Sequence, residues 1–492
     1  MSSIILLIMI LIPILGGFFL FSAKDWEYKK LQIVSETLVV LTSLLVFYTL
    51  FHRPQQQLLL FQLTGNLNIL LKLDGLGCVF AGLVAFLWPL ASLYAFEYME
   101  HDEKRRNTFF GFYTMTYGVT LGIAFAGNIL TLYFFYELLT LVTVYLVMHP
   151  MHKKAIRASR MYLYYSLGGA AFAFLSIICL TIFGDTTNFV LGGVLDLEKV
   201  SAHPNWALTM FLLAFCGFGV KAALFPFHGW LPRASVAPTP VTALLHAVAV
   251  VKSGAFAIIR IIYYSYGAEF LKGTWAQNAV LILAMVTILY ASSMAAKEIH
   301  LKRRLAYSTI SNLSYILLGA AIMTPLGMIG ALSHLVIHAF MKICGFFCVG
   351  AVMHQTGRNY LSEIEGLGRK MPVIFGCFTV AAVSLAGIPP FGGFISKWNL
   401  GTAALLSGNP LGYAAMGVLL YSAFMTAIYM GMILFRAWFP RKEQKLLFTE
   451  RDCEPGWKMK VPILIFVVMI VGLGVFSRPL IQLISEIAYG TF

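Results

Sequence analysis

Seven ionisable side chains stand inside long apolar stretches of the sequence, where a membrane-spanning helix would bury them. They are Glu137, Lys221, His246, Lys252, His334, His338 and Lys342. Lys397 lies near the end of the Gly- and Pro-rich segment AGIPPFGGFISKW. A charged Lys or Glu in the hydrocarbon region costs at least about 2.5–3.5 kcal/mol on insertion scales, so such residues usually have a function.

Carboxylates, amines and imidazoles together can pass protons. Burial favours the neutral form of lysine, whereas a nearby carboxylate favours the charged form. A buried Glu–Lys pair can therefore hold or release a proton, depending on the state of the carboxylate. Histidine exchanges protons near neutral pH, and water can bridge longer gaps. We interpret the eight residues as a proton or ion pathway.

His334, His338 and Lys342 are spaced four residues apart, so their side chains point from one face of a helix. Three titratable groups on one buried face have no evident structural use, which favours a functional role. Glu36 and Asp74, near or within early apolar stretches, are interpreted as structural.

For three of these residues, taken singly, a purely structural role is an open alternative to ion transfer. Lys221, beside Pro226, could extend its ammonium to a membrane interface. Glu137 could join two helices by a hydrogen bond. His246 alone is as compatible with a core histidine as with a relay group.

Two segments contain residues that interrupt helices. KAALFPFHGWLPRASVAPTP places Pro226 shortly after Lys221, and AGIPPFGGFISKW places Pro389 and Pro390 shortly before Lys397. Interrupted apolar segments in matching positions of two halves point to an ion site in transporters built from inverted repeats. We therefore expect broken helices beside both lysines.

The composition is that of an integral membrane protein. Of 492 residues, 59% are hydrophobic and 11% are charged, and the mean hydropathy is +0.81. Soluble chains are about 25% charged, so a water-soluble enzyme, a nucleic-acid-binding protein and a disordered protein are excluded. The fold class is all-α and polytopic, with about 14 spans of about 20 residues each. The apolar stretches are 3–22, 32–51, 75–96, 108–127, 129–148, 161–183, 206–225, 238–264, 277–296, 304–323, 326–352, 372–388, 411–435 and 461–485.

The distribution of lysine and arginine predicts the orientation. With the N-terminus outside, inside loops hold about 25 basic residues, Lys302 among them, and outside loops about 7, Arg260 among them. This is a strong positive-inside bias. Most of the net charge of +14 is therefore a topology signal. We expect both termini on the outer side of the inner (cytoplasmic) membrane of a prokaryotic cell. The stretch 3–22 has no basic n-region and is expected to stay as a span, and 436–460 is expected to lie along a membrane face.

The seven cysteines form no Cys-x-x-Cys pair and no Cys/His cluster with zinc or iron–sulfur spacing. Cys344 and Cys348 share a helix face beside Gly and Phe, and are interpreted as small buried hydrophobic residues. We therefore expect no metal site and no cofactor.

Several segments together resemble the antiporter-like subunits of respiratory complex I, of energy-converting membrane-bound hydrogenases and of Mrp-type cation/proton antiporters. The resemblance covers roughly residues 75–440. It rests on FFYELLTL, KAALFPFHGWLP, APTPVTALLHAVAVVKSGAFAIIR, LKRRLAYSTISNLSYILLG, HLVIHAFMKICGFFCVGAV and GIPPFGGFISKW.

The resemblance implies a bundle of about fourteen helices with two inverted five-helix repeats and broken helices. The implied parts are N-terminal helices in 1–107, a first half-channel in 108–264, a second half-channel in 277–438, and an amphipathic loop with a C-terminal helix in 439–492.

The resemblance also implies roles for the ionisable residues. Glu137 and Lys221 match the Glu–Lys pair of the family, and Lys397 matches the terminal lysine of the second half-channel. The central relay positions of the family are matched by His246, Lys252, His334, His338 and Lys342. Relatives often carry an acidic residue after Trp-Leu-Pro, where this chain has Arg233.

The implied function is proton translocation, with sodium/proton exchange as an alternative, in a complex I-like or hydrogenase-like assembly. The expected order is Glu137/Lys221, His246/Lys252, His338/Lys342, Lys397. The expected partners are antiporter-like or redox-module membrane subunits, membrane lipid and the transported ions, with no nucleic acid. The alternatives are a component of an Mrp-type antiporter, a non-conducting scaffold, and a quinone-binding subunit using Trp230 and His228.

Overall fold

Long apolar helices make up most of the computed structural model, which describes residues 3–52, 57–65, 67–102, 105–440 and 453–492. Ten helical segments among the described residues are long and apolar enough to cross a membrane. The predicted all-α, polytopic membrane fold is therefore confirmed, whereas the number of spans and the inverted repeats stay predictions. The ten segments are Ile4–Phe21, Tyr28–His52, Gly75–Tyr98, Ile129–Met148, Lys153–Phe183, Thr239–Tyr266, Trp275–Lys297, Pro325–Thr356, Leu411–Trp438 and Trp457–Val475.

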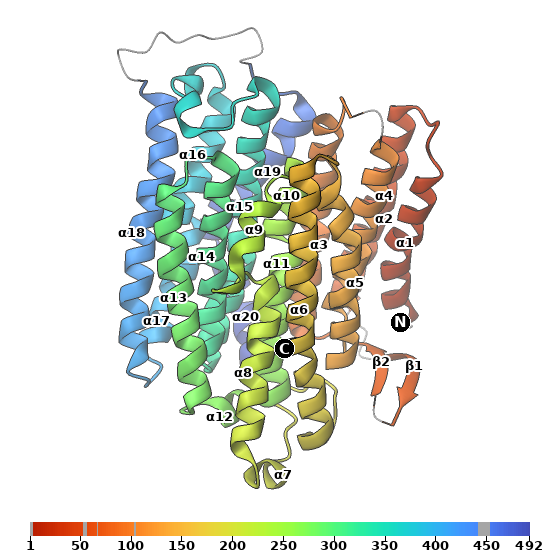
Figure 1. Cartoon of the computed structure of the whole chain (residues 1–492), viewed down its shortest axis with the longest axis vertical. Helices are drawn as coiled ribbons and strands as arrows, with labels where there is room; N and C mark the ends of the chain where they lie inside the picture. The colour runs from red at the N-terminus through yellow and green to blue at the C-terminus, as the bar shows by residue number, and fades with distance from the viewer. Residues whose placement is uncertain (1–2, 53–56, 66, 103–104, 441–452) are drawn as a thin grey trace.

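The first four helices form one side of the bundle (Figure 1). Close packing of α1 on α4 depends on glycine, because a Cβ on Gly17 would lie 2.5 Å from the carbonyl oxygen of Gly111. Asp74 caps α3 by accepting a hydrogen bond from the backbone N–H of Gly77 at 2.9 Å. The bounds are α1 Ile4–Phe21, α2 Tyr28–His52, α3 Gly75–Tyr98 and α4 Arg106–Ala124.

A small antiparallel hairpin, β1 (Leu58–Thr64) and β2 (Leu67–Leu71), connects α2 to α3. The apolar stretches of the sequence did not predict this hairpin, because its strands are much shorter than a membrane-spanning helix. Gly65, with a φ of 48°, begins the turn between the strands.

The next helices surround the first interruption of the chain. α6 and α8 approach closely, since a Cβ on Gly169 would lie 2.8 Å from the carbonyl oxygen of Gly217. After α8 the chain forms only a short 3-10 turn, Phe227–Gly229, and the short α9. The bounds are α5 Ile129–Met148, α6 Lys153–Phe183, α7 Leu197–Ser201, α8 Pro204–Lys221 and α9 Trp230–Ala234.

The centre of the bundle is completely buried, and it includes the predicted stretch 238–264. That stretch is two helices, α10 and α11, which are interrupted at Val248 and Ala249 and followed by a π-helical turn at Ile261–Tyr266. The bounds are α10 Thr239–Ala247, α11 Val250–Arg260, α12 Ala268–Leu271, α13 Trp275–Lys297, α14 Leu301–Ala321 and α15 Pro325–Thr356.

The C-terminal helices differ in two places from the predicted stretches. α17 is a helix where no stretch was predicted, because its Gly, Lys and Asn residues lower its hydropathy. The stretch 461–485 is two helices, α19 and α20, because Pro479 stands in the first turn of α20 and favours a new helix start. The bounds are α16 Pro372–Ala386, α17 Gly392–Leu405, α18 Leu411–Trp438, α19 Trp457–Val475 and α20 Arg478–Tyr489.

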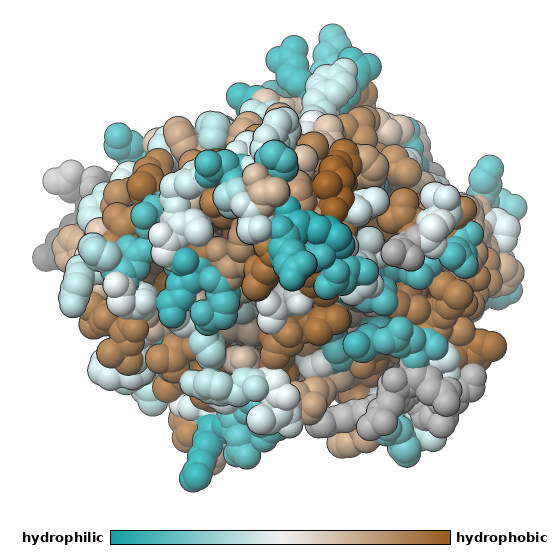
Figure 2. Space-filling view, turned by 90° about the horizontal axis from the view of Figure 1, so that it is seen from below, coloured by the Kyte–Doolittle hydropathy of each residue, from teal (hydrophilic) through white to brown (hydrophobic). Residues whose placement is uncertain are grey.

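The two ends of the bundle differ in charge. The upper end in Figure 1 holds the starts of α6, α14 and α16, with Lys153, Arg303 and Arg369, and is called the basic end. The hairpin, α7, α12 and the N-terminus lie at the opposite, lower end. Figure 2 shows hydrophilic residues scattered across that lower end, with hydrophobic residues reaching its edge. Residues 441–452, about half of the predicted membrane-face stretch 436–460, lie outside the described residues.

Candidate functional site

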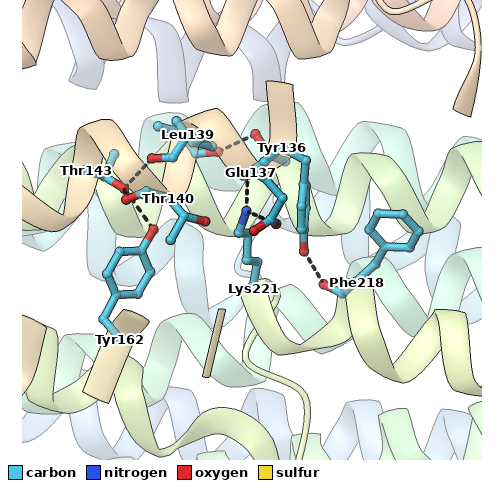
Figure 3. Close-up of polar contacts among 10 residues, drawn as sticks. Tyr136, Glu137, Leu139, Thr140, Thr143, Tyr162, Phe218 and Lys221 are labelled. Atoms are coloured by element: carbon cyan, nitrogen blue, oxygen red, sulfur yellow. Dashed lines mark hydrogen bonds and ion pairs between the residues drawn. The ribbon is translucent and has the colours of Figure 1, made fainter. Parts of the chain in front are cut away.

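An ion pair joins α5 to the last residue of α8 (Figure 3). Lys221 Nζ lies 3.4 Å from Glu137 Oε1, and the two side chains are 1% and 22% exposed. Nζ also donates to the backbone carbonyl of Tyr136 and lies 3.3 Å from the centroid of the Tyr136 ring. A carboxylate, a carbonyl and an aromatic face thus surround one ammonium. Glu137 and Lys221, singled out from the sequence, lie together.

The interruption after α8 leaves Lys221 at a helix end. Ala223 has a positive φ of 57°, and Pro226 lacks the N–H that a continuing helix requires. Trp230 crosses the interruption and donates its indole N–H to the carbonyl oxygen of Val220 at 2.8 Å. The indole therefore satisfies an end carbonyl of α8 beside the lysine.

A second contact joins α11 to α15 in the buried centre. Lys252 Nζ donates to the carbonyl oxygen of Leu335 at 2.9 Å and lies 2.9 Å from Nδ1 of His338. Lys252 and His338 are both 0% exposed. An ammonium donates and a neutral imidazole nitrogen accepts, so this geometry allows a proton to be shared between the two side chains.

The row continues from His338 along α15 and across to α17. The rings of His334 and His338 are stacked, with their centroids 5.4 Å apart. His334 Nδ1 lies 2.9 Å from Ser396 Oγ, and Ser396 precedes Lys397 on α17. The ring of Tyr315 is 5.3 Å from the ring of His334 and 5.4 Å from Lys397 Nζ. Polar groups therefore connect Lys252 to the neighbourhood of Lys397.

Lys397 lies in the second turn of α17, beside the second interruption of the chain, which separates α16 from α17. Its Nζ donates to the carbonyl oxygens of Leu385 at 2.6 Å and Ala386 at 3.2 Å, at the end of α16. Pro389 and Pro390 stand between the two helices. Lys397 thus donates to carbonyls at a broken helix end, whereas Lys221 itself stands at a broken helix end and donates to a carbonyl within α5.

Lys342 points away from the row. Its Nζ donates to Ser308 Oγ at 2.6 Å and to the carbonyl oxygen of Leu305 at 3.3 Å. Ser308 Oγ lies 2.7 Å from the hydroxyl of Tyr429, which lies 3.0 Å from Thr426 Oγ1. This side branch runs among α14, α15 and α18, and Leu305 lies in the half of α14 that begins at the basic end.

The predicted order is therefore incomplete. His334, rather than Lys342, lies between His338 and the neighbourhood of Lys397. Among the described residues, no hydrogen bond joins Lys221 to His246 or Lys252. The spacing of four residues correctly predicted a shared helix face, but one helix face can contact two different neighbouring helices.

His246 lies on α10 with its ring centroid 4.7 Å from that of Phe346. Both of its ring nitrogens lack a hydrogen-bond partner among the described residues, as do Nε2 of His334 and Nε2 of His338. All three histidines are 0% exposed. Buried polar atoms in proteins are nearly always satisfied by protein or by ordered water, so these nitrogens mark polar positions within the core.

Some buried polar residues were not expected. Lys302, which sequence reasoning assigned to an inside loop, is 5% exposed and donates to the carbonyl oxygen of Ala237 at 3.0 Å. Arg260, assigned to an outside loop, is fully buried and binds the carboxylate of Asp74 through both terminal nitrogens. Ser308, Ser396 and Tyr429 were also missed. For Ser308, the dense run of hydroxyl residues in STISNLS was the available signal.

Comparisons with known proteins extend these observations. The family described as "NADH:quinone oxidoreductase/Mrp antiporter, TM" matches residues 126–426. The family described as "NADH-Ubiquinone oxidoreductase (complex I), chain 5 N-terminus" matches residues 61–110. All eight candidate residues lie within the first match.

Two curated relatives are informative. NADH-quinone oxidoreductase subunit N of Desulforudis audaxviator (strain MP104C) is 32% identical over 434 residues, which cover 86% of this chain and 85% of that protein. A Na(+)/H(+) antiporter subunit of Alkalihalophilus pseudofirmus is 32% identical over 356 residues, which cover 69% of this chain and 43% of that protein. The chain thus matches less than half the length of this antiporter protein.

Two solved structures have the same fold. A chain of the membrane-bound sulfane sulfur reductase, an archaeal respiratory membrane complex, has a TM-score of 0.84 at 21% identity, covering 99% of this chain and 98% of that one. A chain of the Mrp complex from Dietzia sp. DQ12-45-1b has a TM-score of 0.85 at 24% identity, covering 98% of this chain and 52% of that one. The predicted resemblance is confirmed, and the chain belongs to the family of antiporter-like membrane subunits shared by NADH:quinone oxidoreductases and Mrp antiporters.

Proposed function

We propose that the chain moves protons, with sodium/proton exchange as the alternative, along the row of buried side chains from Glu137 to Lys397. The observation that carries this proposal is the 2.9 Å contact between Lys252 Nζ and His338 Nδ1 in a completely buried centre. Burying two titratable groups in direct contact, far from solvent, costs free energy. Residues buried at such a cost in a membrane protein usually have a function.

The first step takes place at the Glu137–Lys221 pair. While Glu137 is ionised, it stabilises the ammonium of Lys221 at 3.4 Å. If Glu137 takes up a proton, the ammonium keeps only a carbonyl and an aromatic face, and release of its proton becomes favourable. The state of one carboxylate thus controls a proton on the neighbouring lysine.

The next steps use the histidines. The unpartnered nitrogens of His246, His334 and His338 are suited to water-mediated transfer, and the stacked rings of His334 and His338 lead toward Ser396. Lys397 is the last group of the row. The branch from Lys342 through Ser308 and Tyr429 would give the row access from the basic end.

We propose that the basic end faces the cytoplasm of a prokaryotic cell and that both termini lie on the outer side of its inner membrane. The concentration of Lys and Arg at the basic end supports this orientation. We also propose the division into N-terminal helices (1–107), two half-channels (108–264 and 277–438) and a C-terminal part (439–492). The two interruptions, one in each proposed half-channel, support that division.

The driving energy is proposed to come from partner subunits in a redox-driven assembly of the complex I or hydrogenase type. The 85% coverage of a NADH-quinone oxidoreductase subunit supports this choice, as does the full-length fold match to a chain of a respiratory complex. An Mrp-type assembly is the second candidate, supported by the similarity to Na(+)/H(+) antiporter subunits.

The proposal is tested with the intact assembly in sealed vesicles, where a pH-sensitive dye reports proton transport. Glu137→Ala and Lys221→Ala are each expected to abolish transport while the assembly still forms. Glu198→Ala and Lys199→Ala change an exposed acid and an exposed base at the lower end and are expected to leave transport intact. Normal transport by both pathway variants would favour a non-conducting scaffold.

A further inference from the structure

A large cavity lies at the basic end, outside the row of buried residues. Its volume is about 1210 Å³, and its walls come from α6, α9, α13, α14 and the segment after α15. Five basic side chains line it, against the single carboxylate of Glu298. The basic residues are Lys153, Lys154, Arg157, Arg233 and Arg303.

Most of this positive charge has no acidic partner among the residues that the structure describes. Arg303 binds Glu298, with Nη2 2.9 Å from Oε1. In the part of the chain that the structure describes, the other four basic residues of the cavity form no ion pair. Arg233 instead lies against the sulfur of Met161. The cavity therefore presents unneutralised cations to whatever enters it.

A buried histidine adds a second polar feature. His228 lines the cavity, is 9% exposed, and its Nδ1 has no hydrogen-bond partner among the described residues. Its ring lies against Tyr290, with the centroids 4.7 Å apart. An unpartnered buried nitrogen in a cationic cavity is suited to bind an oxygen atom of a ligand.

Apolar surface continues on both sides of the cavity. α9 lies between α13 and α6 (Figure 1), and these two helices expose apolar side chains away from the bundle. On α6, Tyr164 is 70% exposed and Leu167 is 49% exposed. On α13, Val286 and Leu289 are exposed as well. The cationic cavity thus adjoins two surfaces on which hydrocarbon chains could lie.

We propose that this cavity binds the phosphate headgroup of an anionic phospholipid from the leaflet at the basic end. Basic pockets between helices on one membrane face bind such headgroups, and arginine forms paired hydrogen bonds to phosphate oxygens. Acyl chains would lie on the exposed faces of α6 and α13. Arg233 thereby has a role unrelated to ion access. The two apolar flanks favour a lipid over free phosphate or an acidic protein segment.

The test uses the intact assembly, stripped of lipid in detergent and then incubated with vesicles of phosphatidylglycerol or phosphatidylcholine. Native mass spectrometry counts the phospholipids that remain bound. The wild type is expected to retain phosphatidylglycerol in preference to phosphatidylcholine, and 1 M salt is expected to reduce that preference. Because this measurement uses the wild type alone, it tests the proposal even if a substitution impairs folding.

The double variant Arg157→Gln/Arg233→Gln is expected to weaken retention of phosphatidylglycerol about fivefold for each charge removed. Arg157→Lys/Arg233→Lys keeps the charge and should retain most of the binding. The matched control Arg160→Gln/Arg369→Gln removes two exposed arginines that do not line the cavity, and it is expected to bind as the wild type does.

Three results would overturn the proposal. Equal retention of phosphatidylglycerol by Arg157→Gln/Arg233→Gln and by its control would exclude the cavity as the binding site. Displacement of the lipid by millimolar inorganic phosphate would identify a general anion site. Loss of a partner subunit from the double variant, with lipid retention unchanged, would identify a protein interface.

Discussion

Nζ of Lys252 on α11 lies 2.9 Å from Nδ1 of His338 on α15, and neither residue is exposed. No carboxylate belongs to this contact, which distinguishes it from the Glu137–Lys221 pair. A proton on Lys252 is therefore stabilised mainly by a carbonyl and a neutral imidazole. Such a group can release its proton without breaking an ion pair.

Replacing Lys252 by Met removes that proton carrier and keeps a side chain of similar length. Proton transport by the assembly in sealed vesicles is expected to fall at least about a hundredfold, the usual range for losing a proton-transfer group. Lys199→Met, at the exposed lower end, serves as the control and should transport normally. A Lys252→Met assembly with wild-type transport would exclude Lys252 from the pathway.

The Glu137–Lys221 pair should behave as one unit. Glu137→Gln and Lys221→Met are each expected to reduce transport strongly, and the double variant should be little worse than either single variant. The effects of substitutions at two residues in direct contact are usually non-additive in this way. The measurement is the initial rate of dye quenching for the wild type and the three variants. Independent, additive losses would contradict a shared role.

Tyr429 connects the Lys342 branch to α18 through Ser308 Oγ at 2.7 Å. Tyr429→Phe removes the hydroxyl alone on a side branch, so transport is expected to fall about tenfold, less than the roughly hundredfold loss expected for a transfer group of the row. Tyr421→Phe is a matched control on the same helix, because that hydroxyl forms its hydrogen bond with Ser293 Oγ in an exposed position. Equal transport by the two variants would show that the branch carries no protons.

Asp74 is the partner of the fully buried Arg260. Asp74→Asn leaves that guanidinium without its counter-charge and should destabilise the fold by about 3–5 kcal/mol. Thermal unfolding of the assembly in detergent measures the effect. Asp196→Asn, which affects an exposed pair with Lys199, should change the unfolding temperature little. An unaltered unfolding temperature for Asp74→Asn would contradict a structural role.

His149 lies between α5 and α6, outside the membrane-spanning helices, and its Nε2 is 2.7 Å from Asp102 Oδ2. Burial lowers the pKa of its imidazole below the ordinary value, and Asp102 only partly opposes that effect. The folded chain therefore favours neutral His149. Stability should be full above pH about 6.5 and should fall at lower pH, where the unfolded chain binds the proton more tightly.

The measurement for His149 is the unfolding temperature at pH 7.5 and pH 5.5. His149→Gln cannot be protonated and should lose less stability over this interval, by at most about 1.4 kcal/mol per pH unit. The same pH dependence in both proteins would assign the acid sensitivity to other groups.

The sequence was sufficient to predict the membrane class and to single out the buried charged residues that we propose form the row. A charged residue inside an apolar stretch can be recognised from the sequence alone, because the free-energy cost of burying it depends on the apolar residues next to it in the chain. Pro226 and Pro389 likewise indicated where helices end, because the effect of a proline on a helix is local.

Contacts between helices were not predictable. Ser308 and Ser396 resemble many other helical serines, and they become partners of Lys342 and His334 only when α14, α15 and α17 pack together. The hairpin β1–β2 was missed because its strands are short, and α17 because its apolar content is low. Lys302 was misassigned because the count of basic residues could not distinguish a loop lysine from one folded back into the bundle.

Gly393 is the point at which α17 approaches the end of α16. A Cβ at this position would lie 1.8 Å from the carbonyl oxygen of Ser384, and the Gly393 N–H donates to Ser384 Oγ at 3.1 Å. Even one methyl group would force the two helices apart and withdraw Lys397 from the carbonyls that hold it. The last charge of the row therefore depends on a position four residues earlier, and any engineered or evolved variant of this protein must keep a hydrogen atom there in place of a side chain.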